Sequence, residues 1–229
     1  MAIIKKYKAE VISKLNPAPD LFFLEFISHS GTFRFSPGQF LHLALDEYDS
    51  SFAWPESRCF SIQTPPQNEF LRITFSVKGS FTQRMANEIK VGQIIDLKMP
   101  FGDLFNQNHN KYHTIFISGG TGITPFLSLF NDQLFSEYKN PKLFAGFRYR
   151  ELNLYSSEIE SALQINPNLK IKYVYQNEEG IININDVYKS AKTNASFFIS
   201  GPLLMINTFR TRLIELGINE NRIISDNWE

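Results

Sequence analysis

Residues 119–122 hold three glycines and separate two apolar runs of different kinds. The run before them, residues 114–118, predicts a buried strand, while apolar residues from about Ile123 onward recur at helical spacing. Glycine allows a phosphate to approach the backbone closely, and the unpaired N–H groups at a helix start donate hydrogen bonds to it. Pro125 fits the first helical turn, where its missing N–H has no partner to lose. The segment predicts a phosphate-binding turn, although an ordinary tight turn between strand and helix uses glycine in the same way.

A second run with chemical potential, residues 58–61, places a cation, an aromatic ring and a hydroxyl on a predicted strand. Side chains alternate along a strand, so Arg58 and Phe60 share one face while Cys59 and Ser61 share the other. A guanidinium that binds phosphate bidentately, beside a ring that stacks on a flat heterocycle, is what a flavin nucleotide requires. The alternative from these residues alone is an edge-strand arginine next to a core phenylalanine.

Residues 77–82 form a third candidate, a strand that runs into Gly79 and a short helix that begins near Thr82. Ser80 or Thr82 can cap this helix, and its first N–H groups suit a pyrophosphate. A capped surface helix without a ligand has the same pattern, because such caps are common.

The first hundred residues have the pattern of short alternating strands broken by Pro, Gly, Asn and Asp, with one helical stretch. Six strands at this spacing predict an antiparallel β-barrel. The polar run 106–110 is the predicted linker to a second domain. The predicted strands of the barrel are residues 7–14, 21–27, 39–45, 59–63, 71–77 and 94–99.

The second half of the chain alternates strand and helix, which predicts a parallel sheet whose ligands bind outside the carboxyl ends of its strands. Residues 119–124 and 200–202 both fall at such ends. The predicted strands are 114–118, 142–147, 170–175, 196–200 and 222–225, and the later predicted helices are 155–164, 184–191 and 202–216.

Composition argues against several classes of protein. The 229 residues carry 23 acidic and 23 basic side chains, so the net charge does not favour nucleic acid or an anionic membrane as a partner. Cys59 is the only cysteine, which excludes an intramolecular disulfide, a four-cysteine iron–sulfur cluster and a cysteine-rich zinc site. The first residues lack the apolar core of a signal peptide, and residues 112–131 hold too many glycines and hydroxyls for a membrane helix. We predict a cytoplasmic protein without a metal site, whose redox chemistry would come from an organic cofactor.

Five short motifs occur in the order and spacing of a known family. They are Arg58-Cys-Phe-Ser61, Gly79-Ser-Phe-Thr82, Pro100-Phe-Gly102, Gly119-Gly-Thr-Gly122-Ile-Thr-Pro125 and Ser200-Gly-Pro-Leu-Leu-Met205. Together they resemble the ferredoxin–NADP reductase superfamily over nearly the whole chain. The resemblance implies two domains: an antiparallel six-stranded flavin-binding barrel over residues 1–108, and an α/β domain with a parallel five-stranded sheet for the nicotinamide nucleotide over residues 109–229.

The resemblance assigns the first two motifs to the flavin. Arg58 corresponds to the phosphate ligand, Phe60 to the ring, usually Tyr, that stacks on the isoalloxazine, and Ser61 to a group near flavin N5. Gly79 to Thr82 correspond to the segment that holds the pyrophosphate, which favours FAD over FMN. The implied flavin-binding residues are Arg58, Cys59, Phe60, Ser61, Val77, Lys78, Gly79, Ser80, Phe81 and Thr82.

In the second domain, the resemblance places the nucleotide's pyrophosphate on the glycine turn and the nicotinamide near Ser200, where many members have Cys. Asp226 and Trp228 resemble the family's acid-x-aromatic ending, with the acid near flavin N5 and the aromatic ring over the flavin. Trp228 is otherwise an ordinary anchor of the last strand. The implied nucleotide-binding residues are Gly119, Gly120, Thr121, Gly122, Thr124, Pro125, Arg148, Gly201 and Pro202, with Trp228 on the flavin and with Ser61, Ser200 and Asp226 as the catalytic set.

The choice of coenzyme rests on residues 176–179, Gln-Asn-Glu-Glu, where NADPH-specific members have a Ser-Arg pair. Two carboxylates would repel a 2′-phosphate, which favours NADH. Arg148 and Arg150 leave NADPH open, or else they form a solvated face.

The leading hypothesis is an oxidoreductase that moves a hydride from NAD(P)H to bound FAD and then passes electrons singly to a separate acceptor such as a ferredoxin or flavodoxin. A flavin reductase that uses free flavin as its substrate is the second hypothesis, and the family pattern of that class also has Phe at the position of Phe60. The third is an electron-transfer subunit of a multicomponent redox complex. This sequence holds no iron–sulfur motif, so we expect the acceptor to be a different protein.

Overall fold

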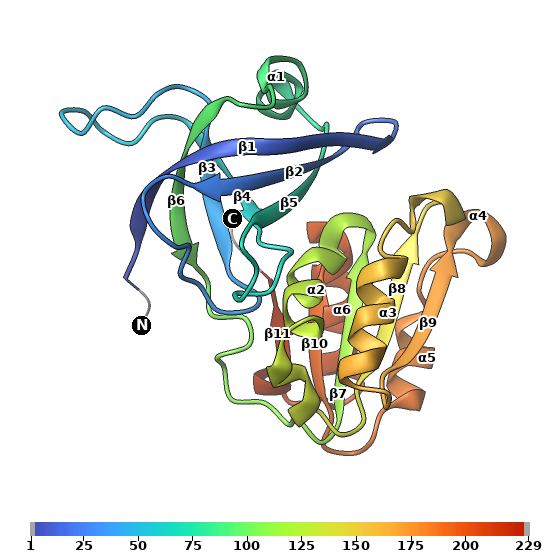
Figure 1. The fold of residues 1–229 in the computed structure, drawn as a ribbon. Coiled ribbons are helices and arrows are strands. Elements are labelled where there is room, and N and C mark those ends of the chain that lie inside the picture. Colours follow the sequence, from blue (N-terminus) through green and yellow to red (C-terminus); the bar gives the residue numbers. More distant parts are fainter. Residues whose placement is uncertain (1–2, 227–229) are drawn as a thin grey trace. The chain divides into compact units, whose positions relative to one another are not determined.

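The computed structural model describes residues 3–226 and divides into two compact units, Met1–Asp103 and Leu104–Glu229 (Figure 1). The first unit is an antiparallel six-stranded sheet, as predicted, with the strand order β4-β3-β6-β1-β2-β5. Just beyond β4, the N–H of Gln63 donates to the carbonyl of Arg72 at 2.8 Å, which links the two ends of the sheet. The strands are β1 (Lys5–Ala18), β2 (Leu21–Ser28), β3 (Phe40–Ala44), β4 (Ser57–Ser61), β5 (Leu71–Ser76) and β6 (Ile94–Phe101).

Strand β1 is the element that differs most from its prediction. It continues to Ala18 through the Asn16-Pro17 pair, which the sequence pattern assigned to a turn. Two register shifts against β2, between Val11 and Ser13 and between Leu15 and Ala18, let the strand bend there. Pro17 is tolerated because such irregular positions do not need its missing N–H for the ladder.

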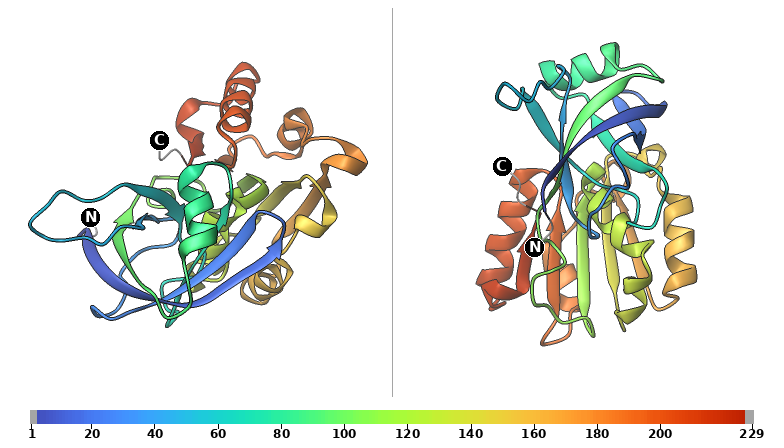
Figure 2. Two further views of the ribbon diagram at one scale, coloured as in Figure 1. Left: turned by 90° about the horizontal axis from the view of Figure 1, so that it is seen from above. Right: turned by 60° about the vertical axis from the view of Figure 1, so that its left-hand side comes forward.

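One apolar cluster fills the first unit. Tyr7, Ala9 and Val11 alternate along β1 with exposed or half-buried residues, so one face of the strand is buried. Helix α1 (Ser80–Glu88) lies across one end of the strands and contributes Phe81 and Met85 to the same cluster (Figures 1 and 2). The barrel interior therefore fixes the position of α1.

The second unit is a parallel five-stranded sheet with the order β11-β10-β7-β8-β9, also as predicted. Its strands are β7 (Thr114–Gly119), β8 (Lys142–Phe147), β9 (Lys170–Tyr175), β10 (Ser196–Ser200) and β11 (Ile223–Ser225). Its helices are α2 (Thr124–Phe130), α3 (Ser156–Ile165), α4 (Gln176–Glu179), α5 (Ile184–Ser190) and α6 (Leu203–Glu215), with 3-10 turns η1 (Gly120–Ile123), η2 (Gln133–Glu137), η3 (Arg150–Leu152) and η4 (Glu220–Arg222). Short helix α4 is the one that the sequence pattern did not predict, because four residues are too few to show helical periodicity.

Helices cover both faces of this sheet, with α2 and α3 on one face and α5 and α6 on the other (Figures 1 and 2). Alternate residues of each strand serve the two faces. Ile117 of β7 belongs to the cluster that includes α5 and α6, while Phe116 packs edge-on against Phe126 and Phe130 of α2. Strands buried on both faces explain why β7 and β10 are continuous apolar runs.

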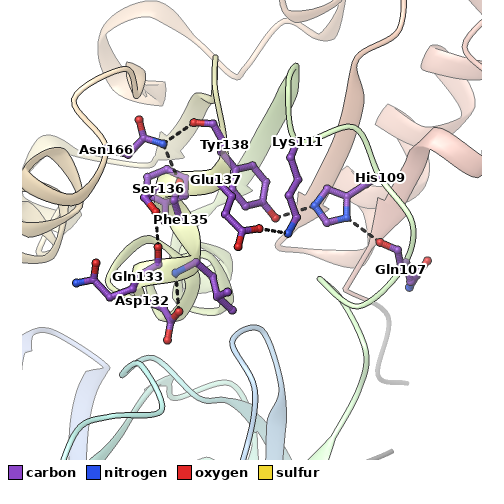
Figure 3. Close-up of polar contacts among 11 residues, drawn as sticks. Gln107, His109, Lys111, Asp132, Gln133, Phe135, Ser136, Glu137, Tyr138 and Asn166 are labelled. Atoms are coloured by element: carbon purple, nitrogen blue, oxygen red, sulfur yellow. Dashed lines mark hydrogen bonds and ion pairs between the residues drawn. The ribbon is translucent and has the colours of Figure 1, made fainter.

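The segment that follows β6 packs onto the second unit, which explains why that unit begins at Leu104. Phe105 contacts the ring of Phe198, with the centroids 5.1 Å apart. His109 Nδ1 lies 2.7 Å from the Gln107 carbonyl, and its Nε2 lies 2.7 Å from the hydroxyl of the buried Tyr138 (Figure 3). In the neutral imidazole, Nδ1 donates to the carbonyl and Nε2 accepts from the phenol. Burial, the larger cause, and nearby Lys111 lower the pKa of His109.

The other polar contacts in Figure 3 fix η2 and the turn after it. Asn166 is buried and donates to the carbonyls of Phe135 and Tyr138 at 2.8 and 2.7 Å. Lys111 pairs with Glu137 at 2.6 Å on the surface. These contacts hold the loop between β7 and β8 in place around Tyr138. No helix within residues 3–226 is both long and apolar enough to span a bilayer.

Candidate functional site

The start of α1 is the first candidate site, and Thr82 shapes it. Its hydroxyl accepts from the N–H of Lys78 at 2.9 Å and of Gly79 at 3.2 Å, and donates to the Gly79 carbonyl at 3.1 Å. The N-cap position belongs to Gly79, which is extended at φ −170°, so neither Ser80 nor Thr82 occupies it. The N–H groups of the first turn have no acceptor within the helix and point out of its start. The exposed start of α1 at Ser80 thus presents backbone donors, whereas the N–H groups of Lys78 and Gly79 already donate to Thr82.

Arg58 lies beside this helix start, although 21 residues separate it from Gly79 in the sequence. Its guanidinium carbon is 4.9 Å from the centroid of the Phe81 ring, a cation–π distance. Its Nη1 donates to the Ser57 carbonyl at 2.9 Å, and its Nη2 pairs with Glu56 at 2.8 Å. Both side chains of that pair are about half exposed, and such surface pairs contribute about 0–1 kcal/mol. A phosphate can therefore replace Glu56 at little cost.

Phe60 lies in the apolar cluster of the first unit. Its ring is a core side chain, which is the alternative that the sequence left open. It is 8% exposed and meets Phe75 edge-on with the centroids 6.1 Å apart. Stacking on a flat heterocycle would require the ring to turn outward, because little of its surface is accessible. Ser61 is also buried, at 6% exposure.

Cys59 faces the side of β4 opposite to Arg58. Its Sγ lies 3.4 Å from His42 Nε2, and His42 Nδ1 lies 3.3 Å from the Ser57 hydroxyl. Burial, the larger cause, and nearby Lys98 lower the pKa of His42, which keeps the imidazole neutral near pH 7. Cys59 thus lies on the side of β4 away from Arg58, which approaches the start of α1.

In the second unit, the glycines allow two loops to pack backbone against backbone. A Cβ on Gly122 would lie 2.4 Å from the Ser200 carbonyl oxygen and 2.5 Å from the Gly201 Cα. A Cβ on Gly119 would lie 2.8 Å from the Met205 sulfur. Gly120 differs, since its φ is +55° and nothing lies within 4 Å of its Cβ position. Gly120 therefore serves an open turn, whereas Gly119 and Gly122 serve the contact between the loops that follow β7 and β10.

The remaining residues of the glycine motif begin the helix. Residues 120–123 form a 3-10 turn, and α2 starts at Thr124 with Pro125 in its first turn, as predicted. The Thr124 hydroxyl donates back to the Thr121 carbonyl at 2.9 Å. Thr121 is thereby tied to the first residue of α2, just beyond the carboxyl end of β7.

Two of the three predicted catalytic residues meet in the second unit. Ser200 ends β10, Asp226 follows β11, and the buried Ser200 hydroxyl donates to Asp226 Oδ2 at 3.3 Å. Their strands are neighbours in the sheet, which explains the contact. The third, Ser61, belongs to the first unit, and Trp228 lies outside the described residues.

Sequence reasoning missed two features at the carboxyl ends of these strands. The Ser118 hydroxyl is buried without a hydrogen-bond partner in residues 3–226, and Ser118 pairs with Ser200 in the strand register. A hydroxyl at the end of an apolar strand, directly before the glycines, was the available signal. The second feature is α4, whose Glu178 pairs with Arg150 at 2.7 Å, whereas the predicted ligand Arg148 is exposed.

One pocket of the second unit lies away from the glycine turn. A pocket of about 510 Å³ runs along β11 and is lined by Gln107, Arg210, Asn219 and neighbouring residues, none of them in the glycine turn. The glycine loops, rather than this pocket, carry the features that nucleotides require. Within residues 3–226 no three His, Cys, Asp or Glu side chains are arranged to hold a metal ion.

Comparison with known proteins agrees with this geometry. A family model for the oxidoreductase NAD-binding domain matches residues 116–211. A flavohemoprotein of Chromobacterium violaceum is 23% identical over 88% of this chain and 55% of its own length. Methane monooxygenase component C of Methylosinus trichosporium is 28% identical over 64% of this chain and 42% of its own. The chain thus spans about half the length of the curated relatives it matches.

Solved structures give the fold over the full length. A ferredoxin NADP+ reductase from Neisseria gonorrhoeae, with bound FAD and NADP, superimposes with a TM-score of 0.79 over 99% of both chains at 19% identity. The fold, the order of the two units and the NAD-binding match agree with one another. The chain thus has the two-domain fold of this ferredoxin NADP+ reductase, and its residues 116–211 match the oxidoreductase NAD-binding domain.

Proposed function

We propose that this chain transfers a hydride from NADH or NADPH to bound FAD and passes the electrons to a separate redox protein. One observation carries the flavin half: Arg58, from β4, lies over Phe81 at the start of α1. A cation beside unpaired backbone N–H groups is a site for a pyrophosphate, since both supply charge-assisted or dipole-aligned donors. A pyrophosphate distinguishes FAD from FMN.

The second unit supports the nicotinamide half. The loops after β7 and β10 lie side by side at the carboxyl ends of neighbouring strands, where parallel sheets bind their ligands. Gly120 leaves the backbone of its turn open to a phosphate. In this proposal the glycine turn holds the nucleotide, while Ser200 and Asp226 position groups near the reacting ring.

The cofactors supply the hydride chemistry when bound, and the protein orients them and excludes water. Asp226 is fixed by the Ser200 hydroxyl at 3.3 Å, so it can hold a hydrogen-bonding group at a set position. Ser61 would contribute the flavin-side hydroxyl in this scheme, as the resemblance to the family implies.

The acceptor we propose is a one-electron redox protein of the cytoplasm, such as a ferredoxin, a flavodoxin or an oxygenase component. Two relatives are named as components of oxygenase systems. They are methane monooxygenase component C and the terephthalate 1,2-dioxygenase reductase component 2 of Comamonas. The Comamonas protein is 30% identical over 56% of this chain and 37% of its own length. An electron-transfer subunit of such a complex would carry out the same chemistry, with one dedicated partner as its acceptor.

A flavin reductase that uses free flavin is the second candidate, because Phe60 is buried and does not present its ring for stacking. The two functions predict different purified proteins. Retained flavin at close to one FAD per chain, reduced by NADH or NADPH in stopped-flow absorbance, supports the first. A colourless protein that reduces added riboflavin with the same nucleotides would reject it in favour of the second.

A further inference from the structure

The thiol of Cys59 lies in one row with His42 and Lys98 across the neighbouring strands β4, β3 and β6. His42 is the direct antiparallel partner of Cys59 on one side and of Lys98 on the other. Side chains directly opposite one another in an antiparallel sheet point to the same face and lie within contact distance. This face is opposite to the one on which Leu41 and Leu43 of β3 join the apolar cluster. The register of the sheet therefore brings together a thiol, an imidazole and an ammonium group.

The imidazole of His42 is oriented by a chain of hydrogen bonds. Its Nδ1 lies 3.3 Å from the Ser57 hydroxyl oxygen, to which Trp54 Nε1–H also donates at 3.0 Å. That oxygen has two lone pairs and accepts from both groups, so the proton of the neutral imidazole is assigned to Nδ1. Nε2 is then the acceptor, and it is the ring nitrogen closer to the Cys59 sulfur, at 3.4 Å against 3.7 Å for Nδ1. A nucleophile within reach of a base that a third group orients is the arrangement of an activated thiol.

The charge around the thiol favours an anionic reagent. Lys98 makes no ion pair in the described part of the chain, and its Nζ lies 5.9 Å from the centroid of the Trp54 ring and 5.8 Å from that of Phe101. Asp96, on the same face of β6, is already paired with Lys8 at 3.0 Å. The cysteine is half-buried rather than enclosed. A partly exposed thiol beside a cation and a base is the environment of a reactive cysteine.

We infer that Cys59 is a modification site whose thiol, activated by His42, forms a mixed disulfide with an anionic low-molecular-weight disulfide such as oxidised glutathione. His42 Nε2 takes the thiol proton, and the thiolate attacks one sulfur of the reagent. The disulfide bond of the reagent breaks as the new bond to Cys59 Sγ forms, and the leaving thiolate takes the proton from the imidazolium. Cys59 is thereby oxidised to the mixed disulfide and half of the reagent is reduced to a thiol, so no other oxidant is needed. Lys98 attracts the carboxylates of the reagent.

The first test compares the folded and the unfolded chain. The complete protein is treated with oxidised glutathione at pH 7, and the addition of one glutathione is followed by mass spectrometry. Cys59 is the only cysteine, so the added mass reports a single site. The folded protein should react at least about fivefold faster than the protein unfolded in urea, because a free cysteine is only a few per cent thiolate at this pH. A folded protein that reacts no faster than the unfolded one overturns the inference.

The His42→Gln variant tests the base. In the folded state it should react at least about fivefold more slowly than wild type, since the thiol loses its proton acceptor, whereas the two unfolded proteins should react equally. His29→Gln is the matched control, because it removes another histidine of the first unit, one that pairs with Glu10. Its rate constant should stay within about twofold of wild type. Equal rate constants for folded His42→Gln and folded wild type overturn the inference.

Ser57→Ala keeps the test decisive if His42→Gln does not fold. This change removes only the hydroxyl that orients His42, so the rate constant should fall about two- to tenfold while the far-ultraviolet circular dichroism stays that of wild type. A folded Ser57→Ala protein that reacts at the wild-type rate contradicts the activation of Cys59 by an oriented His42.

Lys98→Gln tests the choice of an anionic reagent. Rate constants are measured with oxidised glutathione and with the neutral hydroxyethyl disulfide. The ratio of the first to the second should fall about two- to fivefold in Lys98→Gln, the size of one exposed ion pair. An unchanged ratio overturns the assignment of an anionic disulfide. The inference is independent of the proposed function, because neither FAD nor a nicotinamide nucleotide takes part in the reaction.

Discussion

Arg58 has two candidate roles, and its contacts separate them. It is exposed, its ion pair with Glu56 lies on the surface, and it contacts the ring of Phe81 at the start of α1. A residue with few buried contacts contributes little to folding. We expect Arg58→Ala to weaken FAD binding by about 1.5–3 kcal/mol, the range for hydrogen bonds to charged groups, or roughly 10- to 150-fold. Fluorescence titration of the flavin-free protein with FAD measures this.

Arg84→Ala is the matched control for Arg58→Ala. Arg84 is a half-buried arginine of the first unit, on α1, and it pairs with Asp46 and Glu88. FAD affinity should stay within about twofold of wild type in this variant. An Arg58→Ala protein with the wild-type FAD dissociation constant would show that Arg58 is structural.

Ser200 is expected to act through position. Its hydroxyl fixes Asp226, and Ser200→Ala removes that hydrogen bond at the cost of one oxygen atom. We predict a roughly tenfold slower reduction of the flavin by NADH, which corresponds to about 1.4 kcal/mol, with FAD content unchanged. Stopped-flow absorbance and the ratio of flavin to protein absorbance test the two parts. An unaltered reduction rate would remove Ser200 from the catalytic set.

At the scale of elements, the contact between the loops after β7 and β10 decides whether the second unit folds well. Gly122→Ala places a Cβ 2.4–2.5 Å from backbone atoms of residues 200 and 201, which cannot move without displacing β10. We expect a loss of about 1–3 kcal/mol in unfolding free energy, as for other overpacked sites. Urea unfolding of the flavin-free protein measures it.

Gly146→Ala, in β8 of the same sheet, is the variant whose loss of stability is compared with that of Gly122→Ala. Its Cβ would meet the Ile182 side chain at 3.0 Å, and that flexible end can turn away. The loss of stability should be clearly smaller than for Gly122→Ala. Equal losses in the two variants would mean that the loop contact is looser than these distances indicate.

At the scale of the whole molecule, the segment that joins the two units contains a histidine, His109, whose protonation affects the stability of the fold. His109 lies between the Gln107 carbonyl and the Tyr138 hydroxyl, and burial lowers its pKa while Tyr138 and Lys111 face it. In the unfolded chain the His109 side chain takes up a proton as the pH falls through about 6.5. In the folded chain it takes up that proton only at a lower pH. Unfolding free energy should therefore fall as pH drops below about 6.5, and stop falling once the pH is below the lowered folded pKa.

The His109→Gln variant tests the source of that pH dependence. Its unfolding free energy, measured in urea between pH 5 and 7.5, should fall less steeply with decreasing pH than that of wild type. His42 in the first unit has a pKa lowered in the same direction, so some slope should remain until His42→Gln is added. If the slope of unfolding free energy against pH is identical in wild type and His109→Gln, His109 is not a source of the pH dependence.

Much of this protein follows from local pattern. The strands of the second unit were predictable almost to the residue, because strands buried on both faces are unbroken apolar runs. The antiparallel sheet of the first unit followed from alternation and turn residues, and for these strands the signal lies within one short segment of chain. The cofactor classes were implied by the family resemblance, which needed five short motifs in order along the chain.

Other features needed the tertiary structure, since they depend on residues far apart in sequence. Arg58 meets the start of α1, Gly122 touches the backbone of residue 201, and Glu178 holds Arg150, and no single segment contains both members of any of these pairs. The burial of Phe60 was equally undecided, because a ring on a strand suits a core or a ligand equally well until its neighbours are known. Sequence specifies which groups are present and how each segment is shaped. Packing decides which groups meet, because it depends on the side chains of all the segments at once.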